Sequence, residues 1–135
     1  MKKYLALGFA LFFVTACAMF QKNKGAPEWT VKGAGAFNNS GKHVFYGVGI
    51  APATINDESL RRETADNRAR ADIQKVFSTS IEGSMTSYTT NESEKIERVL
   101  KTMQSGKISW VQIVDHYNTS DGTVYSLAKL DLDQL

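Results

Sequence analysis

Apolar and small residues alternate over residues 43–51, which predicts a strand with two unlike faces. One face carries the larger side chains: Val44, Tyr46, Val48 and Ile50. The other face consists mostly of small residues: Phe45, Gly47, Gly49 and Ala51. A face of small residues allows another element to approach the strand backbone closely. Pro52 is expected to end the strand, because proline has no backbone N–H to donate.

A long amphipathic helix is expected next, capped by Asn56 or Asp57 and running to about Thr79. Residues three or four apart form its apolar stripe: Ala65, Ala69, Ile73, Val76 and Ser80. Three further residues are expected to widen this stripe: Leu60, Ala71 and Phe77. Because the alanines are small, we expect the helix to pack against the strand face that contains Gly47 and Gly49.

Residues 80–90 are rich in serine and threonine and leave two interpretations open. They form either a polar strand or a continuation of the helix followed by a loop, and we favour the strand. Residues 91–94 then resemble a capping box with asparagine in place of serine or threonine. The helix that follows has apolar residues at helical spacing: Ile96, Val99, Leu100 and Met103. Gly106 is expected to end this helix.

The C-terminal residues predict a β-hairpin. Its strands are residues 108–117 and 123–132, and an Asp-Gly pair lies in the turn over residues 118–122. Nearer the N-terminus, Trp29–Val31 is expected to begin an edge strand, and residues 33–41 are expected to form a loop. Two helices on one face of an antiparallel sheet make a two-layer α+β domain, which is the fold class we predict.

The first residues follow a different pattern, with Lys2 and Lys3 ahead of the uncharged apolar run Leu5–Val14. This run is too short to span about 30 Å of hydrocarbon as a helix, and it is typical of a secretory signal peptide. The sequence Val-Thr-Ala-Cys that ends at Cys17 resembles a bacterial lipobox. The resemblance implies an S-diacylglycerol on the Cys17 thiol, cleavage before Cys17, and an N-acyl group on its new α-amine.

We therefore divide the chain into a lipoprotein signal peptide (1–16), a flexible lipid tether (17–26) and a single α+β domain (27–135). Several acyl chains on one residue exceed what stable anchoring to a membrane requires. The residue after Cys17 is Ala18 rather than aspartate. Under the enterobacterial sorting rule, this choice favours the outer membrane, with either a periplasmic or a surface-exposed domain.

Charge and composition exclude several classes of function. Lys2 and Lys3 leave with the signal peptide, so the mature chain has 14 basic and 14 acidic residues. This near-neutrality argues against binding nucleic acid or anionic lipid through charge alone. A single cysteine excludes an internal disulfide and a multi-cysteine zinc site. We expect no metal, and no cofactor other than the covalent lipid on Cys17.

Combinations of residues for catalysis or metal binding are weak. His43 and His116 lack a clustered third ligand, so we interpret them as exposed histidines at strand ends. Ser109, Asp115 and His116 supply the residue types of a hydrolase, but no nucleophile-elbow motif accompanies them. The sequence therefore predicts no catalytic residue and a protein that is not an enzyme. Four arginines of the long helix alternate with acidic residues and favour a salt-bridged surface: Arg61, Arg62, Arg68 and Arg70.

A family resemblance rests on four segments after the lipobox, taken in their order along the chain. They are Pro27–Trp29, the strand Tyr46–Ala51, the helix Leu60–Ile73 and the strand Val124–Leu130. Together they resemble the small bacterial outer-membrane lipoprotein family typified by the membrane-associated lipoprotein antigen of Helicobacter, and more distantly the flagellar lipoprotein FlgP. The resemblance implies an outer-membrane or surface lipoprotein without catalytic residues, and a place in flagellar structures for some members.

Two classes of function follow. The first is a structural or interaction lipoprotein in an envelope or flagellar assembly. Its partners are the membrane, a second copy of the chain or envelope proteins, and its contact surfaces are the edge strands and residues 81–90. The alternative is a lipoprotein that captures a small molecule or a glycan between aromatic residues. Those aromatic residues are Tyr46, Tyr88, Trp110, Tyr117 and Tyr125.

Overall fold

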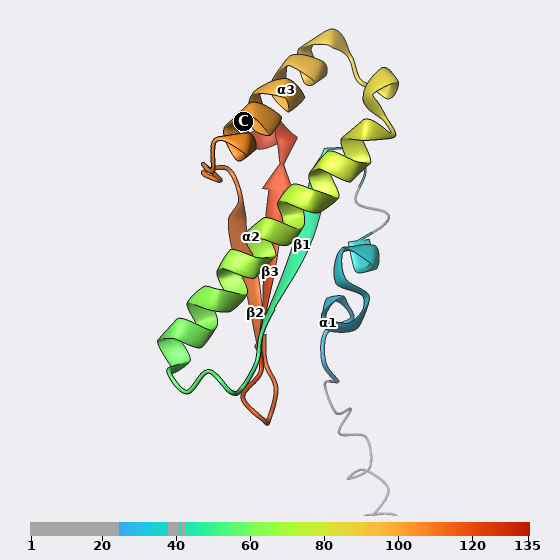
Figure 1. The fold of residues 1–135 in the computed structure, drawn as a ribbon. Helices are drawn as coiled ribbons and strands as arrows, with labels where there is room; N and C mark the ends of the chain where they lie inside the picture. Colours follow the sequence, from blue (N-terminus) through green and yellow to red (C-terminus); the bar gives the residue numbers. More distant parts are fainter. Residues whose placement is uncertain (1–24, 38–40, 42) are drawn as a thin grey trace, which may run out of the picture.

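The computed structural model describes residues 25–37, 41 and 43–135. These residues form the predicted α+β fold, in which one long helix covers a face of a three-stranded antiparallel sheet (Figure 1). Three short 3-10 helices, labelled η, accompany the α-helices and strands. The elements in chain order are α1 (Trp29–Lys32), η1 (Gly33–Phe37), β1 (Val44–Ala51), α2 (Glu58–Glu82), η2 (Met85–Ser87), α3 (Thr90–Gln104), β2 (Gln112–Asn118), β3 (Val124–Asp131) and η3 (Leu132–Gln134).

The C-terminal strand β3 lies at the centre of the sheet, between the edge strands β1 and β2. It pairs with β1 so that Gly47 lies opposite Ala128 and Gly49 lies opposite Ser126. It also pairs with β2, which confirms the predicted hairpin. Because alternate residues of a strand point to opposite faces, these four residues all face the same side of the sheet.

The hairpin differs from its prediction at the start of β2. Residues 108–111, which include Ile108, Trp110 and Val111, form a turn in which the Val111 N–H donates to the Ile108 carbonyl oxygen at 3.4 Å. Val111 is buried in the core, and Ile108 and Trp110 pack against that core. These residues therefore fill space beneath α3 before the strand begins at Gln112.

Helix α2 crosses the sheet diagonally on the side that Gly47 and Gly49 face (Figure 1). A Cβ atom placed on Gly49 would lie 2.0 Å from the Ala65 carbonyl oxygen and 2.2 Å from the Ala69 nitrogen. A Cβ atom on Gly47 would lie 2.4 Å from the Ile73 nitrogen. Only glycine permits such an approach, so the predicted packing of helix on strand is confirmed.

The start of α2 agrees with the prediction, whereas its buried stripe differs from it in part. Asp57 caps the helix, as one of the two expected residues, by accepting the Leu60 N–H at 2.8 Å. The buried stripe follows residues four apart: Ala65, Ala69, Ile73, Phe77 and Ile81. Leu60 is 53% exposed and Ala71 is exposed, so their assignment to the stripe was wrong. Val76 and Ser80, also assigned to the stripe, are only partly buried. Phe77 is buried as predicted, and its ring meets that of Phe45 edge to face at 4.8 Å.

The strand predicted over residues 80–90 was wrong. The structure has the other interpretation, in which α2 continues to Glu82 and is followed by a turn and η2. Ile81 occupies the next position of the buried stripe, which favours one more helical turn. Hydroxyl groups of the segment satisfy local backbone groups, as when Ser87 Oγ donates to the Ser84 carbonyl oxygen at 2.7 Å.

Helix α3 begins and ends at identifiable signals. Its capping box joins Thr89 and Glu92, two residues earlier than the predicted box. At its other end, Gly106 has the positive φ of 79° expected after a helix. The Gly106 N–H donates to Met103 and the Lys107 N–H to Thr102, which is the Schellman pattern.

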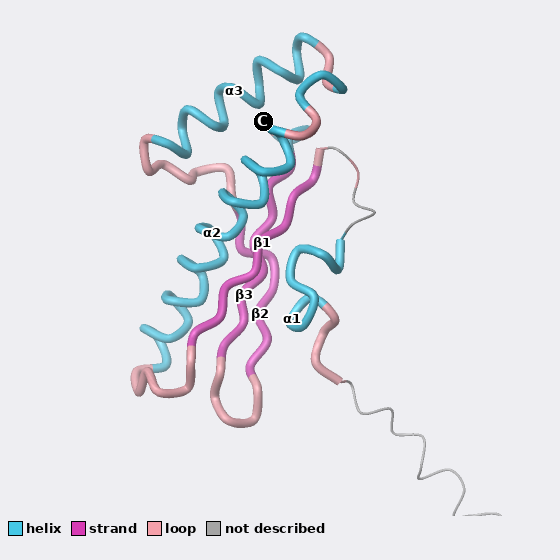
Figure 2. The backbone as a smooth tube through the Cα atoms, turned by 45° about the vertical axis from the view of Figure 1, so that its right-hand side comes forward, coloured by secondary structure: helices cyan, strands magenta, loops and turns pink. Residues whose placement is uncertain are grey.

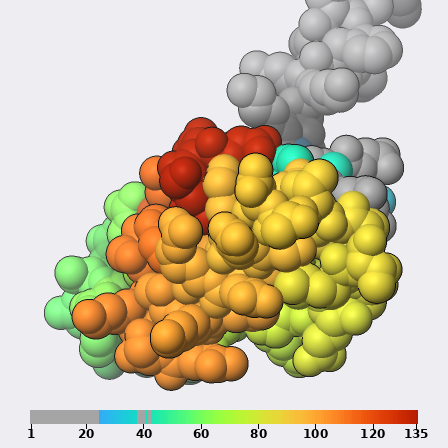
Figure 3. All heavy atoms as spheres, turned by 90° about the horizontal axis from the view of Figure 1, so that it is seen from above, coloured from blue at the N-terminus to red at the C-terminus, as the bar shows by residue number. Residues whose placement is uncertain are grey.

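The core lies between α2, α3 and the sheet. The buried residues of α3, which are Ile96, Val99 and Met103, share one apolar cluster with Phe77, Leu130 and others. Viewed from above, α3 and the C-terminal residues close this end of the molecule (Figure 3). The predicted apolar face of α3 is therefore confirmed.

The N-terminal described residues form α1 and η1 on the opposite side of the sheet from α2 (Figure 2). The edge strand predicted at Trp29–Val31 was therefore wrong. The Thr30 N–H and hydroxyl both donate to the Pro27 carbonyl oxygen, at 3.0 and 2.7 Å, which starts a helical turn. The loop predicted over residues 33–41 contains η1, and residues 38–40 lie outside the described residues.

Candidate functional site

The predicted lipidation site, Cys17, lies outside the described residues. The described chain starts at Gly25, shortly before α1. Within residues 25–37, 41 and 43–135, no helix has the length and apolar composition needed to cross a membrane.

A cluster of polar side chains lies between α2 and the sheet. The carboxylate oxygen Oδ1 of Asp66 accepts from His116 Nε2 at 2.7 Å and from the Ser126 hydroxyl at 2.5 Å. Arg62 Nη2 lies 3.2 Å from the other ring nitrogen, Nδ1 of His116. Because guanidinium groups only donate, this network assigns the proton to Nε2 and leaves Nδ1 as the acceptor.

The Asp66 cluster joins α2 to both strands of the hairpin. Ser126 is fully buried, and its hydroxyl is satisfied by the carboxylate of Asp66. The arrangement differs from a serine-histidine-aspartate triad, in which the serine would contact the histidine. Its chemistry is that of a satisfied polar network, which fixes the position of a helix on a sheet.

The three residues that matched a hydrolase in type have other partners here. The His116 ring contacts Asp66 and Arg62, whereas the Asp115 carboxylate accepts the backbone N–H of His116 at 2.8 Å. Ser109 lies in the turn before β2, against a small hollow beside Trp110. Sequence reasoning missed Asp66 and Ser126. The available signal was one serine within the apolar run of β3.

Two side chains of α2 occupy the outer edge of β1. Asp72 Oδ2 accepts the Val48 N–H at 2.8 Å, and Arg68 Nη1 donates to the Ile50 carbonyl oxygen at 2.6 Å. Edge strands offer such groups to other chains, and capping them prevents strand addition. The sequence analysis predicted contacts through edge strands, and β1 is one of the two edges of this sheet. Its capping leaves β2 as the more available edge.

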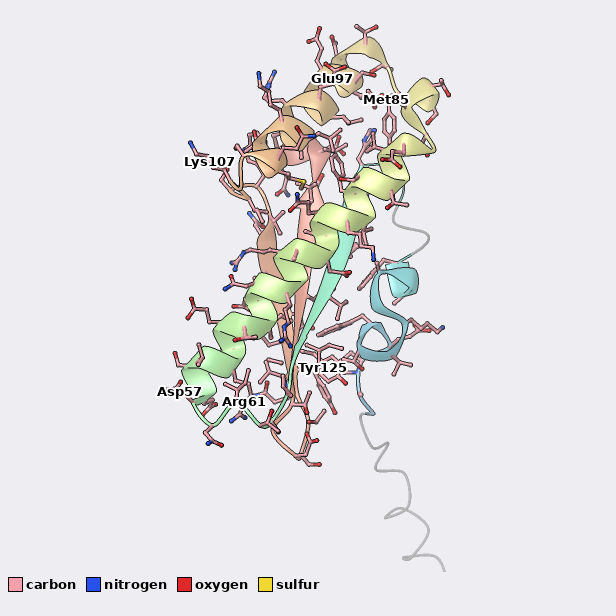
Figure 4. The ribbon with its side chains drawn as sticks, viewed as in Figure 1. Asp57, Arg61, Met85, Glu97, Lys107 and Tyr125 are labelled. Atoms are coloured by element: carbon pink, nitrogen blue, oxygen red, sulfur yellow. The ribbon has the colours of Figure 1, made fainter. Side chains whose placement is uncertain are left out.

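The arginines of α2 form hydrogen bonds rather than the predicted salt bridges. Arg61 donates to the carbonyl oxygens of Ile55 and Gly122, at 2.8 and 2.7 Å, and so holds the hairpin turn against the start of α2 (Figure 4). Among the described residues, no salt bridge involves Arg61, Arg62, Arg68 or Arg70. The predicted salt-bridged surface was wrong, because these guanidinium groups reach carbonyl oxygens, a histidine ring and an amide.

The other edge of the sheet, β2, is more open. Its residues Gln112, Val114, Asp115 and Asn118 are exposed. Its register against β3 shifts between Ile113 and Asp115, which places a bulge at Val114. Bulges are common at sheet edges and restrict how another strand can pair there.

A histidine with two acidic partners lies at the start of β1. His43 Nε2 is 2.7 Å from Glu92 Oε1, and its Nδ1 is 3.0 Å from Asp133 Oδ1. The pKa of Glu92 is lowered, mainly because the backbone N–H and hydroxyl of Thr89 donate to its carboxylate, with a smaller contribution from His43. The predicted exposed strand end is instead a junction between β1, α3 and η3. In the part of the chain that the structure describes, no group of three or more potential ligands is placed to hold a metal ion.

A cavity of about 320 Å³ lies between η1, β1 and α2. Tyr46 and Tyr88 line it, together with Phe37, whose ring stacks on Tyr46 at 3.9 Å. Burial raises the pKa of Tyr88, and the nearby Glu92 carboxylate raises it further. Two of the five aromatic residues predicted to form a binding site therefore share one cavity.

The other three predicted aromatic residues lie elsewhere. Tyr117 and Tyr125 form a pair on the face of the sheet away from α2, with ring centres 6.3 Å apart. Trp110 packs against the core beside the hollow at the start of β2. The five therefore do not line a single site.

Comparison with known proteins places this domain in a family. No curated protein matches the chain. The model of a family described as LPP20 lipoprotein matches residues 27–131, which is nearly the whole α+β domain. The chain therefore belongs to the LPP20 lipoprotein family.

Proposed function

We propose that this lipoprotein is anchored in the outer membrane through lipids on Cys17 and acts by associating with other envelope components. The observation that carries the proposal is the family match, which begins at residue 27. A lipobox-like sequence ends at Cys17, and residues 18–26 provide a link to the domain. We further propose kinship with the Helicobacter antigen and, more distantly, with FlgP, and a place in an envelope or flagellar assembly.

The polar groups of the domain support association rather than catalysis. Among the described residues, every buried side-chain nitrogen or oxygen atom has a hydrogen-bond partner. Asp66, His116 and Ser126 satisfy one another, so their atoms hold the fold together. Catalytic groups usually keep a hydrogen-bonding position or a lone pair available for substrate.

The contact surface that the structure favours is the β2 edge. Two side chains of α2 already occupy groups on the β1 edge, whereas four of the seven residues of β2 are exposed. An exposed strand edge recruits partners through its backbone groups and outward side chains. The bulge at Val114 limits pairing to a partner of matching register.

Photo-crosslinking in cells tests the association. A photo-reactive amino acid replaces Gln112 on β2, and a matched variant carries it at Lys75, which is exposed on α2. We expect a discrete adduct from position 112 in the outer-membrane fraction of a sucrose gradient, and little or none from position 75. Equal labelling at both positions, or a protein confined to the inner membrane, would contradict the proposal.

Ligand capture is the second candidate, and the cavity beside Tyr46 and Tyr88 favours it. Its volume of about 320 Å³ is at the lower end of the range for small-molecule sites. Native mass spectrometry of protein purified from its own membranes would detect a retained small molecule. This candidate predicts an added mass that the Tyr88→Ala variant loses, and an unliganded mass in both proteins would exclude it.

A further inference from the structure

The two faces of the sheet are covered to different extents. Helix α2 lies along one face, whereas of the described residues only the short elements α1 and η1 lie beside the other, near β1 (Figures 1 and 2). The strand register places Ile50 of β1, Tyr125 and Leu127 of β3 and Tyr117 of β2 on this second face. The exposed Asp115 lies opposite Leu127 on the same face, and Lys129 lies further along it. We call Ile50, Tyr117, Tyr125 and Leu127 the open face.

The open face combines apolar and amphipathic side chains. Leu127 is buried, but Ile50 is 44% exposed and the two tyrosines are only partly buried. A tyrosine presents an apolar ring and a polar hydroxyl, a combination that suits the boundary between lipid and water. The most exposed large apolar residue of the described chain, Val31 at 85%, belongs to the adjacent α1.

The described chain begins beside this face. The described chain enters α1 at the end of the molecule where Tyr125 lies (Figure 4). Residues 17–24 separate the predicted lipid from Gly25. A chain of that length spans at most roughly 28 Å, even when fully extended. The bilayer is therefore held within about one domain diameter of the open face.

Because the lipid anchor holds the domain near the membrane, even a weak contact between the open face and lipid is enough to orient the domain. Linking two partners through a short chain converts their contact into an intramolecular one, which raises their effective concentration. The two charged residues on this side of the sheet, Asp115 and Lys129, have opposite signs, and the mature chain has equal numbers of basic and acidic residues, so we expect the contact not to require anionic lipid. On α1, Lys32 pairs with Glu28.

We propose that the open face rests on the surface of the lipid leaflet that holds Cys17. This inference depends on the lipid anchor of the proposed function. Ile50 and Val31 lie at the level of the upper acyl chains, and the Tyr117 and Tyr125 rings lie among the headgroups. The β2 edge and the outer side of α2 then remain accessible to other envelope components.

Depth-dependent fluorescence quenching tests the orientation. The full lipidated protein carries Ile50→Cys, labelled with an environment-sensitive fluorophore, and the matched control carries Lys75→Cys on the outer side of α2. Both are reconstituted into vesicles of phosphatidylethanolamine and phosphatidylglycerol with quenchers on the acyl chains. We expect at least twofold quenching and a blue shift at position 50, no change at position 75, and the same result in phosphatidylcholine or at high salt.

Three outcomes would overturn the inference. The first is that the label at position 50 is quenched no more than the label at position 75. The second is that quenching at position 50 requires anionic lipid. The third is that the emission of the label shifts without any quenching by lipid, which indicates a protein contact such as a second copy. Val31→Cys provides a second position on the same side, should Ile50→Cys fail to fold.

Labelling of the native protein separates this inference from the lipid anchor on which it depends. Lipid on Cys17 leaves no thiol for the fluorophore. Label uptake by native protein would therefore show that the anchor fails. Absence of uptake, together with an unquenched position 50, would show that only the docking fails.

Discussion

The backbone of Gly49 lies so close to that of Ala65 that a Cβ atom on Gly49 would be 2.0 Å from the Ala65 carbonyl oxygen. Real Cβ atoms do not approach a backbone oxygen so closely, and neither backbone can move without separating α2 from β1. The contact therefore sets the distance between the two layers of the fold.

Gly49→Ala is expected to destabilise the domain by more than about 3 kcal/mol, above the usual cost of an overpacked core. Gly83→Ala is the matched control, because a Cβ atom there meets no atom within 4 Å and the backbone φ is −83°. The control should change the free energy of unfolding by at most about 0.5 kcal/mol. Urea unfolding followed by circular dichroism measures both, and similar midpoints for the two variants would refute the close packing.

Asp66 and Ser126 are expected to contribute to stability as a coupled pair. Asp66→Ala leaves the buried Ser126 hydroxyl without its acceptor, at a cost of about 1–3 kcal/mol. The double variant should cost less than the sum of the single variants, with a coupling energy of about 0.5–3 kcal/mol. A double-mutant cycle by urea unfolding checks this, and additive effects would show that the hydroxyl and carboxylate act independently.

Glu92 is expected to make stability depend on pH in the acid range. Its folded-state pKa lies below the ordinary value of 4.5, mainly because Thr89 donates to the carboxylate. Its contribution is therefore complete above that ordinary value and is lost as pH falls through the lower, folded-state pKa.

The Glu92→Gln variant should thus be less stable than the native protein near neutral pH, with a difference that shrinks as the solution is acidified. Thermal unfolding across pH 2–7 measures this, with Glu97→Gln, an exposed position of α3, as the control. A difference that grows on acidification would have the wrong sign for this account.

Removing the caps of the β1 edge is expected to cause self-association. Arg68→Ala combined with Asp72→Ala exposes the Ile50 carbonyl oxygen and the Val48 N–H to other chains. Light scattering should then show a mass that increases with protein concentration. Arg70→Ala, whose side chain contacts Asn67 on the same helix, should leave the mass unchanged. If the double variant keeps the native mass at every concentration, the caps do not protect the edge.

Sequence patterns predicted the elements whose signals are local. The alternation around Gly47, the stripe through Ala69 and the spacing from Ile96 to Met103 each identify one face of one element, and the structure confirms all three. The glycine face also predicted its partner helix, because only one helix offered alanines at matching spacing.

Patterns that depend on distant partners were harder to interpret. Residues 80–90 have hydroxyl groups suited to a strand or a turn, and the burial of Ile81 among residues of α3 decides for a helix. Trp29 resembles a strand residue, but its burial accompanies a helical turn that Pro27 begins. Neither the charges nor the spacing in the sequence could predict the hydrogen-bond partners of Arg68 and Arg61. These partners, the carbonyl oxygens of Ile50 and Gly122, lie on other elements of the fold.

The central claim is that Cys17 carries lipid and anchors the domain, and mass spectrometry of the native protein tests it most directly. The account predicts an N-terminal peptide that begins at Cys17 and carries a diacylglyceryl thioether and an N-acyl chain, with the Cys17→Ala variant released from the membrane fraction. A Cys17 peptide without lipid, or a Cys17→Ala variant that floats with membranes as fully as the native protein, would contradict it.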